Sequence, residues 1–241
     1  MLQAYKKVGE TPLELLDRLR QEQPDLKKEI LSYAGRLDPM AEGEMLILVG
    51  KEENQENKNY FGFDKEYTAT FLVGMATDTR DALGLITNTK ADCTIHSTVI
   101  EQDLKNIKKL TEQTYPWFSG MTVDGIKLFD HFKAGRTDIE RPVQSISIKK
   151  AELISEENMQ AEDVYEYIKD TISKVHGDFR QKEILESWES YFEKHKEPLQ
   201  KFTVRFHVSG GTFIRALTEE FSSPVTLFTL KRTKIHTNLL K

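Results

Sequence analysis

Residues 34–43, Ala-Gly-Arg-Leu-Asp-Pro-Met-Ala-Glu-Gly, place the carboxylate of Asp38 on a constrained loop. Pro39 restricts the backbone of Asp38 to extended conformations, and glycines free the chain on either side. The apolar run Met45–Val49, which ends at Gly50, predicts a buried strand directly after this loop. A carboxylate held in this way is a candidate catalytic group, although the same pattern taken alone is typical of an ordinary turn.

Hydrophobic periodicity predicts strands and helices that do not alternate strictly, which indicates an α+β fold. Thr11-Pro12-Leu13-Glu14 has the pattern of a capping box, so we expect a helix from about Pro12 to Gln21. Further strands are expected at residues 65–74, 144–153 and 202–208. Further helices are expected at residues 98–110, in two segments parted at Gly177-Asp178, and from residue 212 through Phe221.

Length and composition favour a folded protein, since 241 residues suffice for one large domain or two small ones and 38% of them are hydrophobic. The N-terminus lacks an apolar segment behind its basic start, and the longest apolar run is too short to span a bilayer. Cys93 is the only cysteine, which excludes a disulfide or a thiolate metal cluster within one chain. We therefore expect a cytoplasmic protein with no membrane association.

The formal net charge of -5 conceals a strong segregation of charge along the chain. Residues 151–197 hold 13 acidic and 6 basic residues, which leaves 26 acidic and 28 basic residues elsewhere. Basic residues outside this block form short groups: Lys105, Lys108 and Lys109; Lys127, Lys133 and Arg136; and Lys231, Arg232 and Lys234. Such groups fit contacts with nucleic-acid phosphates, although each alone is more typical of a solvated face.

Three further segments carry the remaining functional signal. They are Lys65-Glu66-Tyr67-Thr68-Ala69 with Gly74-Met75-Ala76-Thr77-Asp78-Thr79-Arg80-Asp81-Ala82-Leu83-Gly84; Tyr115-Pro116-Trp117-Phe118-Ser119-Gly120 with Leu128-Phe129, Ala134-Gly135 and Glu140-Arg141-Pro142-Val143; and Ser209-Gly210-Gly211-Thr212-Phe213-Ile214-Arg215. In this order, and with residues 34–43 in front, they resemble the motifs of the TruB family of pseudouridine synthases. The resemblance implies the pseudouridine synthase fold, with a mixed, largely antiparallel central sheet flanked by helices.

The resemblance also implies an enzyme that isomerises a uridine in the T-loop of transfer RNA, without a cofactor or a metal. Asp38 is then the catalytic carboxylate, which either attacks C1′ or removes the 2′ proton, and the sequence does not choose between these steps. Arg215 is expected to pair with Asp38, keep it ionised and fix its orientation. Tyr67 is expected to stack on the target base and to help remove the C5 proton. Without the motifs, a surface arginine and a core tyrosine are the simpler interpretations.

Seven residues are predicted to bind the substrate. Tyr33 occupies the position of a family histidine that lies near the flipped bases, so it is a candidate for stacking, with a packed tyrosine as the alternative. Ile214 and Leu217 are candidates for the apolar wall of the pocket. The remaining candidates come from the matched segments: Lys6, Gly35, Arg36 and Thr212.

Several positions depart from the family pattern. The usual Lys-Pro-x-Gly reads Lys6-Lys7-Val8-Gly9, and Thr122 and Gly210 stand where lysines are usual. Residues 155–198 are interpreted as an acidic helical insertion, which we expect to lie on a face away from RNA or to bind a protein partner. After Arg232 the chain has no room for the C-terminal PUA domain of many members, so we expect one catalytic domain over residues 1–241.

Three alternatives stay open at this point. The triplet Arg36-Leu37-Asp38 is more typical of the related RluA-type synthases, which act on other RNA. A non-catalytic RNA-binding or folding factor would share the fold, although the joint presence of Asp38, Tyr67 and Arg215 speaks against it. A scaffold that binds a partner through the acidic helices is the third. The expected partner is the T-arm of tRNA, and we expect a monomer.

Overall fold

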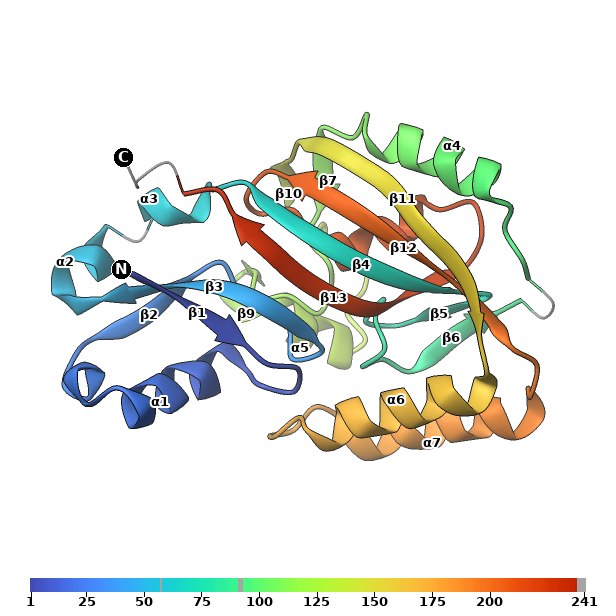
Figure 1. Ribbon diagram of the computed structural model, residues 1–241, viewed down its shortest axis with the longest axis horizontal. Helices are drawn as coiled ribbons and strands as arrows, with labels where there is room; N and C mark the ends of the chain where they lie inside the picture. The colour runs from blue at the N-terminus through green and yellow to red at the C-terminus, as the bar shows by residue number, and fades with distance from the viewer. Residues whose placement is uncertain (57, 91–92, 238–241) are drawn as a thin grey trace.

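The computed structural model describes residues 1–56, 58–90 and 93–237, and a seven-stranded sheet forms its centre (Figure 1). The order across the sheet is β1 (Leu2–Lys6), β3 (Ala41–Val49), β13 (Val225–Ile235), β4 (Lys65–Val73), β12 (Leu199–Val208) and β11 (Ile148–Met159), and β2 (Leu31–Ala34) also pairs with β3. Only the pair of β3 with β13 is parallel among these described strands. The expected α+β fold with a mixed, largely antiparallel sheet is therefore present.

The parallel pair depends on a glycine. Gly43 faces Arg232 in the register of β3 and β13 and has a φ of +123°. A Cβ at this position would lie 2.1 Å from the carbonyl oxygen of Arg232, so no other residue fits. The second glycine of the stretch around Asp38 thus lets β3 approach the C-terminal strand.

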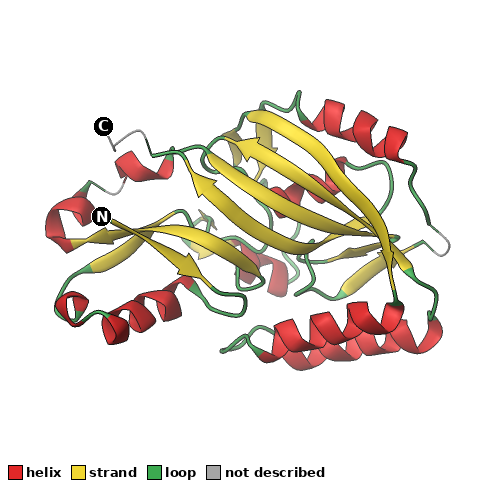
Figure 2. Ribbon diagram, in the orientation of Figure 1, coloured by secondary structure: helices red, strands yellow, loops and turns green. Residues whose placement is uncertain are grey.

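The helices surround the sheet (Figure 2). The first, α1 (Pro12–Glu22), begins at the predicted capping box, where Thr11 and Glu14 exchange side-chain and backbone bonds. Leu15, Leu16 and Leu19 on its inner face are buried. The other described elements are η1 (Pro24–Leu26), α2 (Gly50–Gln55), α3 (Lys58–Phe61), β5 (Met75–Thr77), β6 (Ile86–Thr89), α4 (Ser97–Ile107), β7 (Glu112–Thr114), β8 (Thr122–Val123), β9 (Ile126–Lys127), α5 (Leu128–Lys133), β10 (Val143–Ser145) and the 3-10 helix η2 (Ile214–Glu220).

The acidic segment contains the two predicted helices, α6 (Ala161–Ser173) and α7 (Gln181–Lys194), which form a hairpin. The segment is not helical throughout, because residues 155–159 continue β11 of the central sheet. Ile168 and Trp188 are fully buried in a cluster that includes Leu72 and Phe228 of the sheet. This hairpin, which we call the α6–α7 hairpin, is therefore packed onto the sheet and does not project freely (Figure 1).

The predicted strand over residues 144–153 is wrong as a single element. Val143–Ser145 pairs with β7 in a separate two-stranded sheet, and the strand of the central sheet begins only at Ile148. Between them Ser147 exchanges bonds with Ser209, whose Oγ accepts from the Ser147 amide at 2.8 Å. Two elements with the same β pattern in sequence thus belong to different sheets. No described helix has the length and apolar character that crossing a membrane requires.

Candidate active site

Asp38 lies in the loop between β2 and β3, and that loop is held by backbone bonds. The Ala41 amide donates to the Asp38 carbonyl at 3.0 Å, and the Gly9 amide donates to the Pro39 carbonyl at 2.8 Å. These bonds close a turn at Asp38 and tie it to the segment after β1. The carboxylate is thereby fixed by its own loop and by the N-terminus.

The buried side chain of Lys6 supports this loop by hydrogen bonds to backbone carbonyl oxygens. Its side chain is fully buried, and Nζ donates to the carbonyl oxygens of Ala41 at 2.5 Å and Lys7 at 3.0 Å. Burial lowers the pKa of Lys6 to about 8, because the charged form loses hydration. Lys6 lines neither cavity of the site, so the expectation that it contacts substrate is not supported.

Arg215, at the start of η2, lies against Asp38. Its Nε is 2.9 Å from Asp38 Oδ2, and the two form an ion pair whose N–H is not aimed well enough for a hydrogen bond. Nη1 donates to the Thr79 carbonyl at 3.1 Å, and Nη2 donates to the Phe118 carbonyl. The guanidinium is thus fixed by three segments of the chain, and the contact predicted between Arg215 and Asp38 is observed.

A second carboxyl group, that of Asp81, belongs to the same charge network. Asp81 is buried and accepts from Thr79 Oγ1 at 2.7 Å and from the Leu83 amide at 3.0 Å. Burial raises the pKa of Asp81 to about 6, although the charge of Arg215 acts in the opposite direction. The sequence offered a signal for Asp81 in its Thr-Asp-Thr-Arg-Asp string, but gave no role for this residue.

Two adjoining cavities, of about 520 and about 90 Å³, have Asp38 and Arg215 on their common wall. Tyr67 of β4 lines the smaller cavity with only 6% of its surface exposed, beside Thr212 and Ile214. Asp38, Tyr67 and Arg215, which are far apart in sequence, therefore meet around one concavity. A concave site on which polar and charged groups converge is typical of a binding or catalytic pocket.

Tyr33 and Arg36 lie at the larger cavity, as predicted for substrate-binding residues. Arg36 lines both cavities, and its Nη2 donates to the Tyr33 hydroxyl at 3.3 Å. The tyrosine is half-buried and also packs against the main core cluster, which fits the alternative of a packed tyrosine. Its ring is placed where it can contact a ligand, and its stacking role stays a prediction.

The structure does not bring Leu217 or Gly35 to the cavities. Leu217 lies one turn beyond Ile214 in η2 and is fully buried in the main core cluster, and the apolar lining comes from Leu37 and Leu230 instead. Gly35 has a φ of +82° and packs against the buried side chains of Lys65 and Arg232. Gly35 thus shapes the loop rather than contacting a ligand.

The larger cavity is basic on balance. Five basic side chains line it, against three acidic ones. The basic ones are Arg36, Lys127, Lys133, Arg180 and Arg215, and the acidic ones are Asp38, Asp81 and Asp178. Asp38 is paired with Arg215, and Arg180 is paired with Asp78, which does not line the cavity. Arg36, Lys127 and Lys133 then outnumber Asp81 and Asp178, and this excess positive charge favours an anionic ligand.

The described part of the chain holds one group of possible metal ligands, which lies outside this site. Glu66, His207 and His236 have potential ligand atoms within 4.8 Å of one another. His236 Nε2 is paired with Glu66 Oε1 at 2.7 Å, and none of the three lines either cavity.

The acidic segment, expected on a face away from RNA or at a protein partner, reaches the larger cavity at its tip. Asp178, Phe179 and Arg180, in the turn between α6 and α7, line the larger cavity together with Asp38. Helical periodicity identifies the buried face of each helix, but it does not show which part of the molecule the turn will reach. Neither Phe179 nor Arg180 was predicted as a site residue.

Similarity to known proteins covers most of these segments. A family model described as TruB family pseudouridylate synthase (N terminal domain) matches residues 25–171. Proteins named tRNA pseudouridine synthase B are 32% identical over 139 residues in Psychrobacter arcticus and 30% identical over 161 residues in Staphylococcus aureus. These alignments cover 57% and 65% of the chain, but only 36% and 50% of the relatives, so the chain spans half or less of their length.

A solved structure shares the fold. The crystal structure of a Cbf5-Nop10-Gar1 complex contains a chain that matches 96% of this one with a TM-score of 0.55. The identity is 14%, and the match covers 47% of the other chain. At this identity the similarity concerns the fold alone.

Proposed function

The chain belongs to the TruB family of pseudouridylate synthases, and on that premise we propose that it converts a uridine in the T-loop of tRNA to pseudouridine. Asp38 is the proposed catalytic carboxylate. The observation that supports the proposal best is the ion pair of Asp38 with Arg215, on the common wall of two cavities and beside Tyr67.

The reaction is an isomerisation that balances without a redox partner. The bond from N1 to C1′ breaks, the uracil turns, a bond from C5 to C1′ forms, and the C5 proton is lost while N1 gains a proton. Asp38 either attacks C1′ or removes the 2′ proton, and both roles need an ionised carboxylate. The adjacent guanidinium of Arg215 supplies a counter-charge to that carboxylate and orients it.

The other residues of the site fit this assignment. A uridine inside a folded loop must leave its stack before the chemistry, at a cost of about a few kcal/mol. Tyr67 lines the smaller cavity and is the proposed contact of the extruded base, and Ile214 and Thr212 complete that wall. Tyr33 and Arg36, at the mouth of the larger cavity, are placed to contact neighbouring nucleotides.

RNA is the proposed partner because the larger cavity carries an excess of basic side chains. A tRNA substrate is proposed because the relatives are named tRNA pseudouridine synthase B. Family membership also favours this substrate over the RNA substrates of RluA-type enzymes.

Release of tritium from uridine C5 tests the proposal. The purified chain is incubated with tRNA labelled at C5 of its uridines, and with labelled ribosomal RNA in parallel. We expect release from tRNA by the wild-type chain and none by Asp38→Ala, with tRNA binding and folding nearly intact because a loop carboxylate contributes little to the core. Turnover by Asp38→Ala contradicts the assignment of Asp38, and release only from ribosomal RNA contradicts the proposed substrate.

A further inference from the structure

The turn of the α6–α7 hairpin reaches the same cavity as the catalytic carboxylate. Asp178, Phe179 and Arg180 line this cavity together with Asp38 and Arg215. We call residues 176–180 the hairpin tip. Phe179 is 38% exposed, which is high for a large apolar side chain on the wall of a charged cavity. This exposed ring has no role in the chemistry proposed above.

The hairpin tip is rigid, because one side chain bonds across it. Gln181 Oε1 accepts from the Phe179 amide at 3.0 Å, and Gln181 Nε2 donates to the carbonyl oxygens of Gly177 at 2.7 Å and Val175 at 3.1 Å. Gly177 has a φ of +97°, and a Cβ there would lie 3.4 Å from the ring of Phe179. The backbone that carries the ring is therefore held by Gln181, and the glycine leaves the space next to the ring free of a side chain.

Arg180 fastens the hairpin tip to the motif that contains Asp81. Its Nη1 lies 2.7 Å from Asp78 Oδ2, and its guanidinium stands 4.8 Å from the centroid of the Phe118 ring. The Phe118 carbonyl in turn accepts from Arg215. Arg180 has a φ of +59°, which is rare outside glycine, so its contacts outweigh a local backbone cost. Arg180 is thus a positioning residue that connects the tip to the partner of Asp38.

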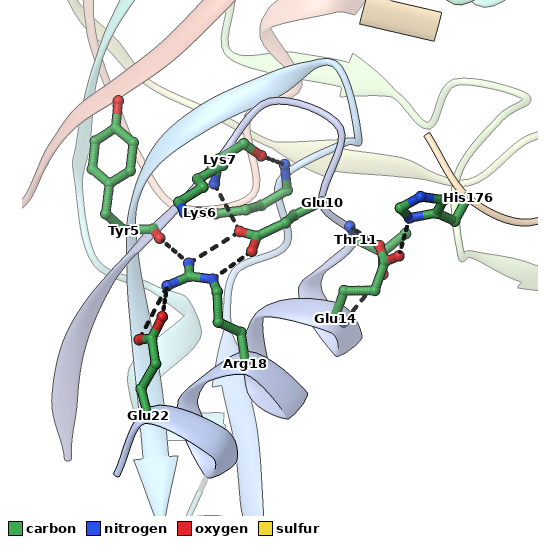
Figure 3. A network of polar contacts seen from close by, with 9 residues as sticks. All are labelled: Tyr5, Lys6, Lys7, Glu10, Thr11, Glu14, Arg18, Glu22 and His176. Atoms are coloured by element: carbon green, nitrogen blue, oxygen red, sulfur yellow. Dashed lines mark hydrogen bonds and ion pairs between the residues drawn. The ribbon is translucent and has the colours of Figure 1, made fainter. Parts of the chain in front are cut away.

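A second attachment joins the tip to the N-terminal segment. Figure 3 shows the ring of His176 turned toward Glu14, with His176 Nδ1 2.9 Å from Glu14 Oε1. Glu14 is also the acidic member of the capping box that starts α1. Nearby, Gly9 packs so closely that a Cβ would lie 2.4 Å from Lys174 Cβ. The tip and the end of α6 before it therefore contact the N-terminal segment as well as the Asp78 turn.

We propose that the hairpin tip is part of the RNA-binding surface, and that Phe179 is a stacking platform for an unpaired base next to the extruded uridine. This inference rests on the proposed function. A base offers a flat apolar face for the ring, while Lys127 and Lys133 on the same cavity offer positive charge to its phosphates. An apolar ring among basic side chains fits a nucleotide better than an apolar protein surface, which would leave those charges unpaired.

Binding of a fluorescently labelled T-arm stem-loop, measured by anisotropy with Asp38→Ala as the background, tests the platform without turnover. Phe179→Ala is expected to raise the Kd about tenfold, the loss typical of one stacked base. Phe179→Trp is expected to restore the affinity, because it keeps an aromatic face. Phe61→Ala is the matched control, since Phe61 is 45% exposed and lines neither cavity.

Salt dependence separates stacking from charge. Phe179→Ala should leave the slope of log Kd against log salt unchanged, whereas Lys127→Ala should reduce it by about one. In the active background, Phe179→Ala should raise KM and change kcat little, since in this assignment the ring contacts a base that does not react.

A Kd for Phe179→Ala within twofold of its background overturns the inference, and so does failure of Phe179→Trp to restore affinity. The proposed function fails separately, if the wild-type chain releases no tritium. A chain without turnover whose RNA affinity still depends on the aromatic ring would keep the platform and lose the reaction.

Discussion

The two walls of the cavity are built on different principles. The wall around Asp38 assembles from residues far apart in sequence, which are joined by charges and polar bonds: Arg215 contacts Asp38, Thr79 and Phe118. The α6–α7 hairpin is contiguous and is held mainly by apolar burial around Trp188, with ion pairs to other segments at its tip and a hydrogen bond from the Ile86 amide to Ser187 of α7. Chemistry thus depends on the first wall and the shape of the cleft on the second, so substitutions in the two should separate activity from stability.

The largest effect on activity and stability is expected for Arg215, because one substitution removes both a charge and several polar contacts. Arg215→Ala should lower the rate of isomerisation by about a thousandfold or more, because Asp38 loses its orientation and counter-charge. It should also lower the free energy of unfolding by about 3–5 kcal/mol, since the Thr79 and Phe118 carbonyl oxygens lose their donor and the buried Asp81 loses a nearby positive charge. Tritium release and urea unfolding measure the two losses.

Arg215→Lys is the control for this substitution. A lysine keeps the charge but cannot hold Asp38, Thr79 and Phe118 with one rigid fork, so it should recover more stability than activity. An Arg215→Ala variant that turns over at the wild-type rate would remove Arg215 from the site.

The two walls differ in how much of their structure the sequence predicts. Motif order predicted the contact of Asp38 with Arg215 and the position of Tyr67, because each motif carries a residue type that the chemistry requires. It did not predict that Lys6 is buried beneath the loop. A lysine in a motif can donate to backbone carbonyl oxygens or bind phosphates, and the sequence does not distinguish these roles. Leu217 was misplaced for a similar reason, because an apolar residue near a site can line the pocket or the core behind it.

The second wall shows the limit of periodicity. The spacing of apolar residues predicted α6 and α7 and the break at Gly177, but not the neighbour of the turn between them. That neighbour is set by Arg180 and His176, whose partners Asp78 and Glu14 are distant in sequence. The sequence offers only a weak signal for this contact, namely Phe179 next to Arg180 in a turn that contains Gly177.

In the second wall, Trp188→Ala should lower stability and leave the activity of the folded protein nearly unchanged. The side chain is fully buried and stacks on Phe192 with 6.0 Å between ring centroids, so truncation should lower the free energy of unfolding by about 3–5 kcal/mol. The rate per folded molecule should change only a few-fold, since Trp188 lines neither cavity. Urea unfolding gives the first quantity, and tritium release below the unfolding temperature gives the second. Trp188→Phe, which refills most of the volume, should cost much less, and a thousandfold drop in rate would contradict the proposed division of roles.

The pH dependence of stability tests the buried charge of the first wall. The pKa of Asp81 is raised from 3.8 to about 6, so between these values the native state binds a proton that the unfolded chain has lost. The Asp81 contribution to the free energy of unfolding therefore falls as pH rises from about 4 to 6, by about 3 kcal/mol in total. Asp81→Asn lacks this titration. The difference in unfolding free energy, variant minus wild type, should thus rise by that amount over this range, and parallel urea-derived curves would contradict the shift.

The smallest effect is expected where the two walls meet, at Arg180 and Asp78. A double-mutant cycle with Arg180→Met and Asp78→Asn should give a coupling of about 1–2 kcal/mol in the free energy of unfolding, because the pair is mostly shielded from water. Asparagine keeps the oxygen that accepts from the Leu85 amide at 2.9 Å, so the cycle isolates the ion pair. If the Arg180–Asp78 pair positions the hairpin tip, Arg180→Met should also lower the affinity for RNA. The loss should be smaller than in Phe179→Ala, because the ring of Phe179 is still present and only its position is less well fixed. Zero coupling together with unchanged RNA affinity would mean that the hairpin contacts the catalytic wall without positioning anything on it.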